Sequence, residues 1–244
     1  MDLEAIVDLF TQGNEHERAN DLLPARRLLT AALDAAAATG VPSIVQASHH
    51  LLGVVEHKAA RLDEARTHLE EGLRLAIADG DLQSEAFSRQ EVGFLKLDED
   101  DFSGALIQFR RELAVAPGTG ILNLTGNGLS GMGVALLGLD RAGEAIPLLH
   151  AALSIRTEIG DLEQQHIDLT HLAVAALRCG DPELAAAIAG FLAASADTAA
   201  GMYGHDKRAL DSVLQAVQGR DVAPAESFEE VRILVRQVQA AEES

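Results

Sequence analysis

Small residues recur along this chain at a fixed spacing of 40 positions, and no other feature limits the possible folds as strongly. One column of glycines is Gly13, Gly53, Gly93 and Gly133, and it continues as Ala173. The same spacing aligns two more columns of small residues: Ala25, Ala65, Ala105, Ala145 and Ala185, then Gly40, Gly80, Gly120, Gly160 and Ala200. Because the three columns keep one register without an insertion, they indicate an internal repeat. Each unit must then bury its apolar face against its neighbours.

Each repeat has the pattern of two helices. Asp2 is placed to cap the first helix, and Asn20 or Asp21 to cap a second that runs from about 22 to 39. Apolar residues of the second helix lie three or four positions apart: Leu22, Ala25, Leu28, Leu29, Ala32 and Leu33. This spacing predicts one buried helical face. Gly40 is expected to end the helix, because glycine tolerates the left-handed conformation.

The period divides residues 1–200 into repeats of equal length, which are 1–40, 41–80, 81–120, 121–160 and 161–200. Residues 201–244 depart from the period and are predicted to form a C-terminal helical cap. Its first helix is expected from His205 to Gln218, and its second after Ser227, which forms a capping box with Glu230. The predicted fold class is therefore all-α, with about five helix-turn-helix repeats and a capping helix pair.

Charge and composition exclude several classes of function. The net charge is −19 and the basic residues are scattered, which argues against direct nucleic-acid binding. No apolar run approaches the roughly 20 residues that a membrane span needs. Cys179 is the only cysteine, so no intramolecular disulfide can form, and no signal peptide is apparent. These features predict a cytoplasmic protein that does not bind membranes.

Within one repeat, Gly53, Ala65, Leu69 and Gly72 are separated by 12, 4 and 3 positions. This pattern resembles the anchor residues of tetratricopeptide repeats. The period of 40 exceeds the usual 34 and resembles a long-helix variant. That variant occurs in the C-terminal sensory repeats of bacterial signal-transduction ATPases and their regulators. Glu112 departs from the pattern, since it replaces a small residue. The resemblance implies a right-handed α-solenoid whose first helices line a concave groove.

The resemblance also implies which side chains face this groove. Most of them lie in four columns along the first helices, and the predicted binding residues are His50, Val54, His57, Lys58, Gln90, Phe94, Asn127, Ser130, Val134, Thr170 and Arg178. An apolar floor with a polar row suits an extended peptide, because apolar contact supplies affinity and polar groups fix the register. For the valines and Phe94, packing between helices is the alternative.

Two further patterns allow more than one interpretation. His50 and His57 lie seven positions apart on one helical face. They can be interpreted either as a patch that recognises a carboxylate or as two partly exposed polar residues. Helical metal-ligand pairs favour a spacing of four, so no metal site is expected. Residues 126–131 match a dinucleotide-binding fingerprint, but that motif needs a strand before it. In helical register, its glycines would instead admit a close neighbour or a ligand backbone.

No nucleophile with a base and an orienting group is recognisable, so no enzymatic activity and no cofactor are expected. We predict a protein–protein interaction scaffold that binds a peptide or a partner protein segment in its concave groove. The resemblance places this role in bacterial signalling or transcription regulation. A small-molecule-sensing regulatory domain, with the glycine-rich helix in its pocket, is the alternative. The sequence leaves a homo-oligomer open.

Overall fold

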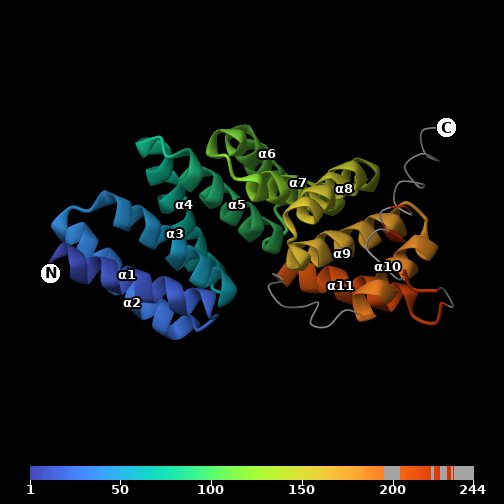
Figure 1. Ribbon diagram of the computed structural model, residues 1–244, viewed down its shortest axis with the longest axis horizontal. Helices are drawn as coiled ribbons and strands as arrows, with labels where there is room; N and C mark the ends of the chain where they lie inside the picture. The colour runs from blue at the N-terminus through green and yellow to red at the C-terminus, as the bar shows by residue number, and fades with distance from the viewer. Residues whose placement is uncertain (195–203, 221–222, 226–229, 232, 234–244) are drawn as a thin grey trace.

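The computed structural model describes residues 1–194, 204–220, 223–225, 230–231 and 233, and within them the ordered elements are helices without strands. The helices are α1 (Leu3–Arg18), α2 (Leu22–Thr39), α3 (Pro42–Lys58), α4 (Leu62–Asp79), α5 (Leu82–Asp98), α6 (Phe102–Thr119), α7 (Leu122–Gly138), α8 (Ala142–Ile159), α9 (Leu162–Arg178), α10 (Pro182–Ala194) and α11 (Gly204–Val217). Consecutive helices from α1 to α10 pack in pairs, and the pairs stack into an elongated solenoid (Figure 1). The expected all-α repeat fold is confirmed.

Contacts between helices define an inner and an outer row. The first helices of successive repeats touch one another, α1 with α3, α3 with α5, α5 with α7 and α7 with α9. Within the part of the chain that the structure describes, the second helices make no such contacts with each other. Helices that lie closer together belong to the concave side of a curved stack. The first helices therefore form the inner row, as the resemblance implies.

The repeat period is visible in the backbone between helices. Gly40 ends α2 with φ of 72°, and glycines with similar angles stand at 80, 120 and 160. Inside each repeat, a second left-handed residue joins the two helices, and it is Asn20 in the first repeat. Asn20 or Asp21 is expected to cap α2, and Asp21 does occupy the N-cap position, but the expected side-chain capping bond is absent. The carboxylate of Asp21 makes no capping bond and contacts His16 at 3.2 Å instead.

The glycine and alanine columns hold the two helices of each repeat together. Ala65 has no exposed surface, and neither do the other four alanines of its column. A Cβ atom added at Gly53 would lie 2.4 Å from Cγ of Leu69, well inside van der Waals contact. The equivalent pairs are Gly13 with Leu29, Gly93 with Phe109 and Gly133 with Leu149. The column that defines the period is thus a column of close helix approach.

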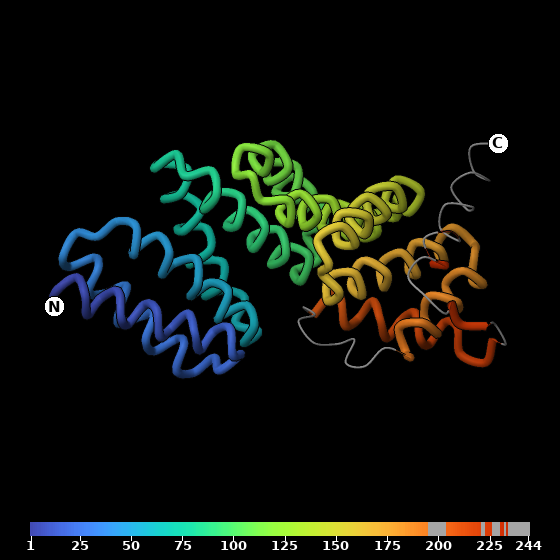
Figure 2. The backbone as a smooth tube through the Cα atoms, viewed as in Figure 1, coloured from blue at the N-terminus to red at the C-terminus, as the bar shows by residue number. Residues whose placement is uncertain are grey.

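Beyond the fifth pair, α11 packs on α9 and α10 and also reaches α5 (Figure 2). Its bounds agree with the helix expected from His205 to Gln218. The start of the second capping helix, predicted at Ser227, lies outside the described residues. No helix in the described ranges combines the length and the apolar character that crossing a membrane requires.

Candidate functional site

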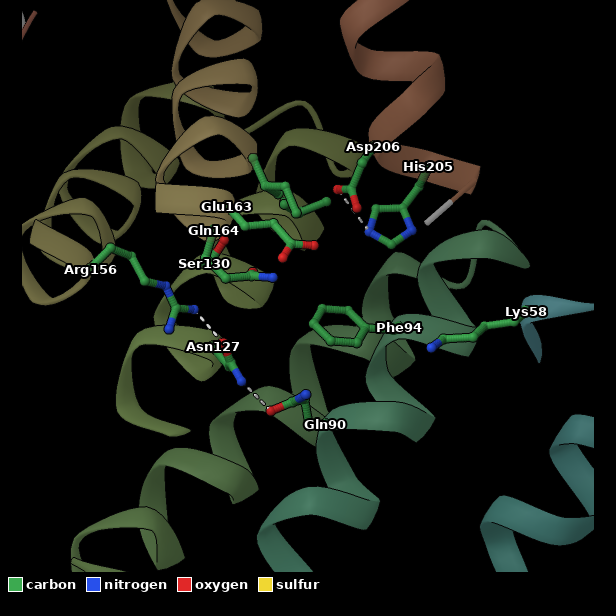
Figure 3. Close-up of a pocket in the computed structure, with 12 residues that line it drawn as sticks. Lys58, Gln90, Phe94, Asn127, Ser130, Arg156, Glu163, Gln164, His205 and Asp206 are labelled. Atoms are coloured by element: carbon green, nitrogen blue, oxygen red, sulfur yellow. Dashed lines mark hydrogen bonds and ion pairs between the residues drawn. The ribbon is translucent and has the colours of Figure 1, made fainter. Parts of the chain in front are cut away.

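A cavity of about 240 Å³ opens on the inner face, where α5, α7, α9 and α11 converge (Figure 3). Its lining comes from six helices: Lys58 of α3, Gln90 and Phe94 of α5, Asn127, Ser130 and Val134 of α7, Arg156 of α8, Glu163, Gln164 and Ile167 of α9, and His205 and Asp206 of α11. The spacings on α5 and α7 are three or four residues, so each helix presents one face to the cavity. The site is therefore a product of the inner row together with α11.

Six of the eleven predicted binding residues line this cavity, namely Lys58, Gln90, Phe94, Asn127, Ser130 and Val134. The other five lie elsewhere. Val54 is buried between helices, which is the alternative stated for it. Thr170 is also buried and donates to the carbonyl of His166 at 2.9 Å. Arg178 is exposed and donates to the carbonyl of Leu137 in the preceding repeat.

The two histidines of α3 do not form a joint patch for an external carboxylate. His50 lies 3.5 Å from the hydroxyl of Ser88. Nε2 of His57 lies 2.9 Å from a carboxylate oxygen of Asp98. Only 4% of His57 is exposed, so the interpretation as a partly exposed polar residue is wrong for it. The carboxylate that His57 recognises belongs to this chain.

A row of hydrogen bonds between side chains runs along the lining of the cavity. The guanidinium of Arg156 donates to the amide oxygen of Asn127, and the amide nitrogen of Asn127 donates to Gln90. Gln90 in turn donates to Glu91 at 3.3 Å. These bonds run from α8 through α7 to α5 and orient both amides (Figure 3). Each amide has two donors and an oxygen with two lone pairs, so capacity remains for a ligand.

Arg156 anchors this row from inside the protein. It is fully buried, donates to the backbone and side chain of Asn123, and lies 3.8 Å from Asp168. Gly126 makes room for it, because a Cβ atom there would lie 2.8 Å from Nη1 of Arg156. Burial raises the pKa of Asp168 to about 7, against the opposing charge of Arg156. The two groups form a buried ion pair whose carboxyl is only partly ionised near neutral pH.

A second buried acid lies nearby in the outer row. Glu112 of α6 has no exposed surface, and its carboxyl oxygens have no hydrogen-bond partner within the described structure. Burial, reinforced by the charge of Glu91, raises the pKa of Glu112 to about 9. This side chain is therefore a neutral acid at physiological pH. It occupies the position at which the repeat pattern has a small residue.

The glycine-rich segment lies wholly inside α7, and no strand precedes it. It therefore lacks the loop that the dinucleotide motif requires. Each glycine instead faces a large side chain. A Cβ atom at Gly128 would lie 2.8 Å from Leu113, and one at Gly131 would lie 2.4 Å from the ring of Phe109. The interpretation that these glycines admit close neighbours is confirmed.

Alternating imidazoles and carboxylates join the inner row to α11. Asp98 contacts His57 and, at 3.3 Å, His205, while Asp206 contacts His171 at 2.7 Å. Burial raises the pKa of Asp98, but the hydrogen bonds and charges of His205 and His57 outweigh burial and hold that pKa well below its usual range. Among the described residues, no group of three or more potential ligands could hold a metal ion.

No protein-family model and no curated protein matches this chain. Several solved structures do match. One is a signal transduction ATPase with numerous domains and a tetratricopeptide repeat sensor from Pyrococcus horikoshii, at a TM-score of 0.66 and 14% identity, covering 97% of this chain and 36% of that one. Another is the apo form of RapI, at a TM-score of 0.64 and 14% identity, covering 86% and 82%. TPR-like repeats assigned to a kinesin light chain of Podosopora anserina give 0.60 and 14%, covering 88% and 97%.

The chain has the tetratricopeptide-type repeat fold. Within this fold, the predicted residues on α3, α5 and α7 identify much of the lining that comes from the first helices. The lining residues of α9, which are Glu163, Gln164 and Ile167, were not predicted, because they lie nearer the start of their helix than the predicted columns do. Arg156 gave no signal of its own, because it lies on a second helix, which the fold places in the outer row. His205 and Asp206 gave none either, because they follow the end of the period. The one sequence signal for Arg156 is Gly126, because a glycine inside a predicted helix indicates that a neighbouring side chain packs closely against that helix.

Proposed function

We propose that this chain is a non-enzymatic interaction scaffold that binds an extended segment of a partner protein across α5, α7 and α9. The observation that carries the proposal is the row of oriented amides beside an apolar floor. An extended peptide presents N–H and C=O groups that need partners once they leave water. Gln90, Asn127 and Gln164 can donate to and accept from such groups. Phe94 and Val134 supply the apolar contact.

The charges around the cavity favour recognition of a backbone over recognition of one charge. Lys58 and Arg156 line it, but so do Glu163 and Asp206. The ammonium of Lys58 lies 2.6 Å from Glu17, and it is therefore already paired. With both signs present, the lining of the cavity as a whole does not favour a segment of one net charge.

A small-molecule sensor is the second candidate, and the enclosed polar cavity is the observation in its favour. Pockets that hold a whole small ligand usually measure roughly 300–1,000 Å³. The cavity here is about 240 Å³, which suits one or two side chains of a longer segment. We therefore rank the peptide first. We further propose a cytoplasmic role in bacterial signalling or transcription regulation, supported by the likeness to a repeat sensor of a signal transduction ATPase.

The test is capture of partners from lysate of the source cell, identified by mass spectrometry and then measured as synthetic peptides. A Gln90→Ala, Phe94→Ala double variant is compared with wild type and with Gln83→Ala, which removes an exposed glutamine from the same helix. We expect wild type and Gln83→Ala to retain a partner that the double variant binds at least about tenfold more weakly. Equal binding by all three would reject the groove. A metabolite that raises the melting temperature, with no peptide bound, would favour the sensor.

A further inference from the structure

Helix α11 lies on the inner side of the solenoid. It contacts α9 and α10 and extends to α5, a first helix of the third repeat. Apart from α10, at the end of the array, no second helix contacts α11 within the described residues. It therefore spans the same side of the stack as the cavity, and its first turn reaches the cavity wall (Figure 3).

The first turn of α11 places a ring and a carboxylate on groups of the repeat array. The ring of His205 stacks on Phe94, with centroids 6.0 Å apart and planes 26° apart. The carboxylate of Asp206 lies 2.7 Å from Nε2 of His171. Both side chains are at least nine-tenths buried. The ring of Phe94 and the imidazole of His171 thus bind two consecutive residues of α11, in the way that a groove binds a short linear motif.

The rest of α11 is held by few apolar contacts. Val213 is the fully buried apolar side chain of the helix, and Leu210 and Val217 are partly buried. By contrast, α10 buries seven of its residues. Elements with few buried apolar contacts open at low free energy. The first turn of α11 can therefore leave the groove while the array stays folded.

We propose that residues 204–206 are an internal ligand of the groove, and that the partner segment replaces them with an aromatic ring on Phe94 and an acidic side chain on His171. This inference rests on the proposed function, and it adds the chemistry of the partner and the way in which access is regulated. When only a fraction of molecules has α11 displaced, the apparent affinity for the partner falls by that fraction. Release of α11 should therefore tighten binding without any new contact.

The direct test uses a labelled synthetic peptide with the sequence of residues 204–217 as the probe. Full-length Val213→Asp should release α11, because it places a charge at the buried anchor. Leu214→Asp is the matched control, since Leu214 is 41% exposed on the same helix. We expect Val213→Asp to bind the peptide at least about tenfold more tightly than wild type or Leu214→Asp, as measured by fluorescence anisotropy.

The peptide itself carries the chemical test. Replacing its aspartate by asparagine (Asp206→Asn), or its histidine by alanine (His205→Ala), should each weaken binding to Val213→Asp at least about tenfold. Equal binding of the three peptides, or equal binding by all three proteins, would overturn the inference. If Val213→Asp does not fold, the full-length His205→Ala, Asp206→Ala variant replaces it, because it removes the two groove contacts and leaves the apolar anchor.

The failure of this inference can be told apart from the failure of the proposed function. A captured partner that depends on Gln90 and Phe94, but binds Val213→Asp no more tightly than wild type, rejects the internal ligand alone. Capture that is indifferent to Gln90 and Phe94 rejects the groove as the partner site. Tighter capture by Val213→Asp, together with dependence on Gln90 and Phe94, supports both.

Discussion

The first two repeats and the last three follow the same period, but they differ in how their buried charged side chains are paired. In the first two, buried carboxylates pair with cations that reach solvent, as Glu56 does with Arg26, whose side chain is 48% exposed. In the later part of the array, Arg156 and Asp168 are both fully buried, and Glu112 is buried without a hydrogen-bond partner in the described structure. The comparison shows that the repeat period constrains the small and apolar residues of each column. It does not constrain how buried charged side chains are paired. Of the buried charged groups in the later repeats, Arg156 borders the cavity, and burying such groups costs stability.

Among the tests of this difference, Arg156→Ala should have the largest effect on stability. Removing one member of a buried ion pair leaves the other uncompensated, so we expect the free energy of unfolding to fall by about 3–5 kcal/mol. The matched control in the first region is Arg74→Ala, whose side chain is 61% exposed and paired with Glu71. It should change stability by about 0.5 kcal/mol or less. Urea unfolding followed by circular dichroism measures both, and equal losses would remove the distinction between the regions.

A second test uses pH. The pKa of Glu112 is about 9 in the folded chain, against an ordinary value of 4.5. Between these values the folded state keeps a proton that the unfolded state releases, so stability falls as pH rises through the window. Glu112→Gln keeps the shape without titrating. The free energy of unfolding of Glu112→Gln, relative to that of wild type, should rise between pH 5 and pH 9 by up to about 1.4 kcal/mol for each pH unit.

The control for the pH test is Glu71→Gln in the first region. The hydrogen bond from Arg74 holds the pKa of Glu71 below its ordinary value. Stability that comes from a lowered carboxyl pKa is present above the ordinary value and is lost as pH falls. Glu71→Gln should therefore gain nothing between pH 5 and pH 9. Parallel pH profiles for wild type and Glu112→Gln would show that Glu112 is ionised in the folded chain.

The smallest effects should be shared by the two regions. A Cβ atom would lie 2.4 Å from Leu69 at Gly53 and 2.6 Å from Leu149 at Gly133. We expect Gly53→Ala and Gly133→Ala each to cost about 1–3 kcal/mol through overpacking. Gly143→Ala, with nothing within 4 Å, should instead stabilise by about 0.5–1 kcal/mol. Thermal unfolding can rank the three, and a loss confined to one region would show that the column does not act equally along the array.

Sequence periodicity was sufficient for the helices, their pairing and much of the inner face. Columns that recur every 40 positions placed Phe94 and Val134, and Gln90 and Ser130, at equivalent positions of successive repeats, and these residues do line one cavity. Periodicity was a poorer guide to individual polar groups. Asp21 has the residue type and position of a cap, yet its carboxylate contacts His16. The residue type indicates which hydrogen bonds a side chain can form, and the groups that lie near it in the folded chain determine which of them it forms.

The sequence by itself determined the repeat, because small residues at a fixed period leave only close helix packing as a way to bury the apolar faces. Only the tertiary structure decided which charges are buried together and what borders the cavity. Asp98 and His205 are 107 positions apart, and Arg156 meets Asp168 from an adjacent repeat. The period specifies how small and apolar residues pack between neighbouring helices, but it does not specify which charged residues meet. Contacts across the groove depend on how the whole stack curves and on where the helix after the last repeat returns.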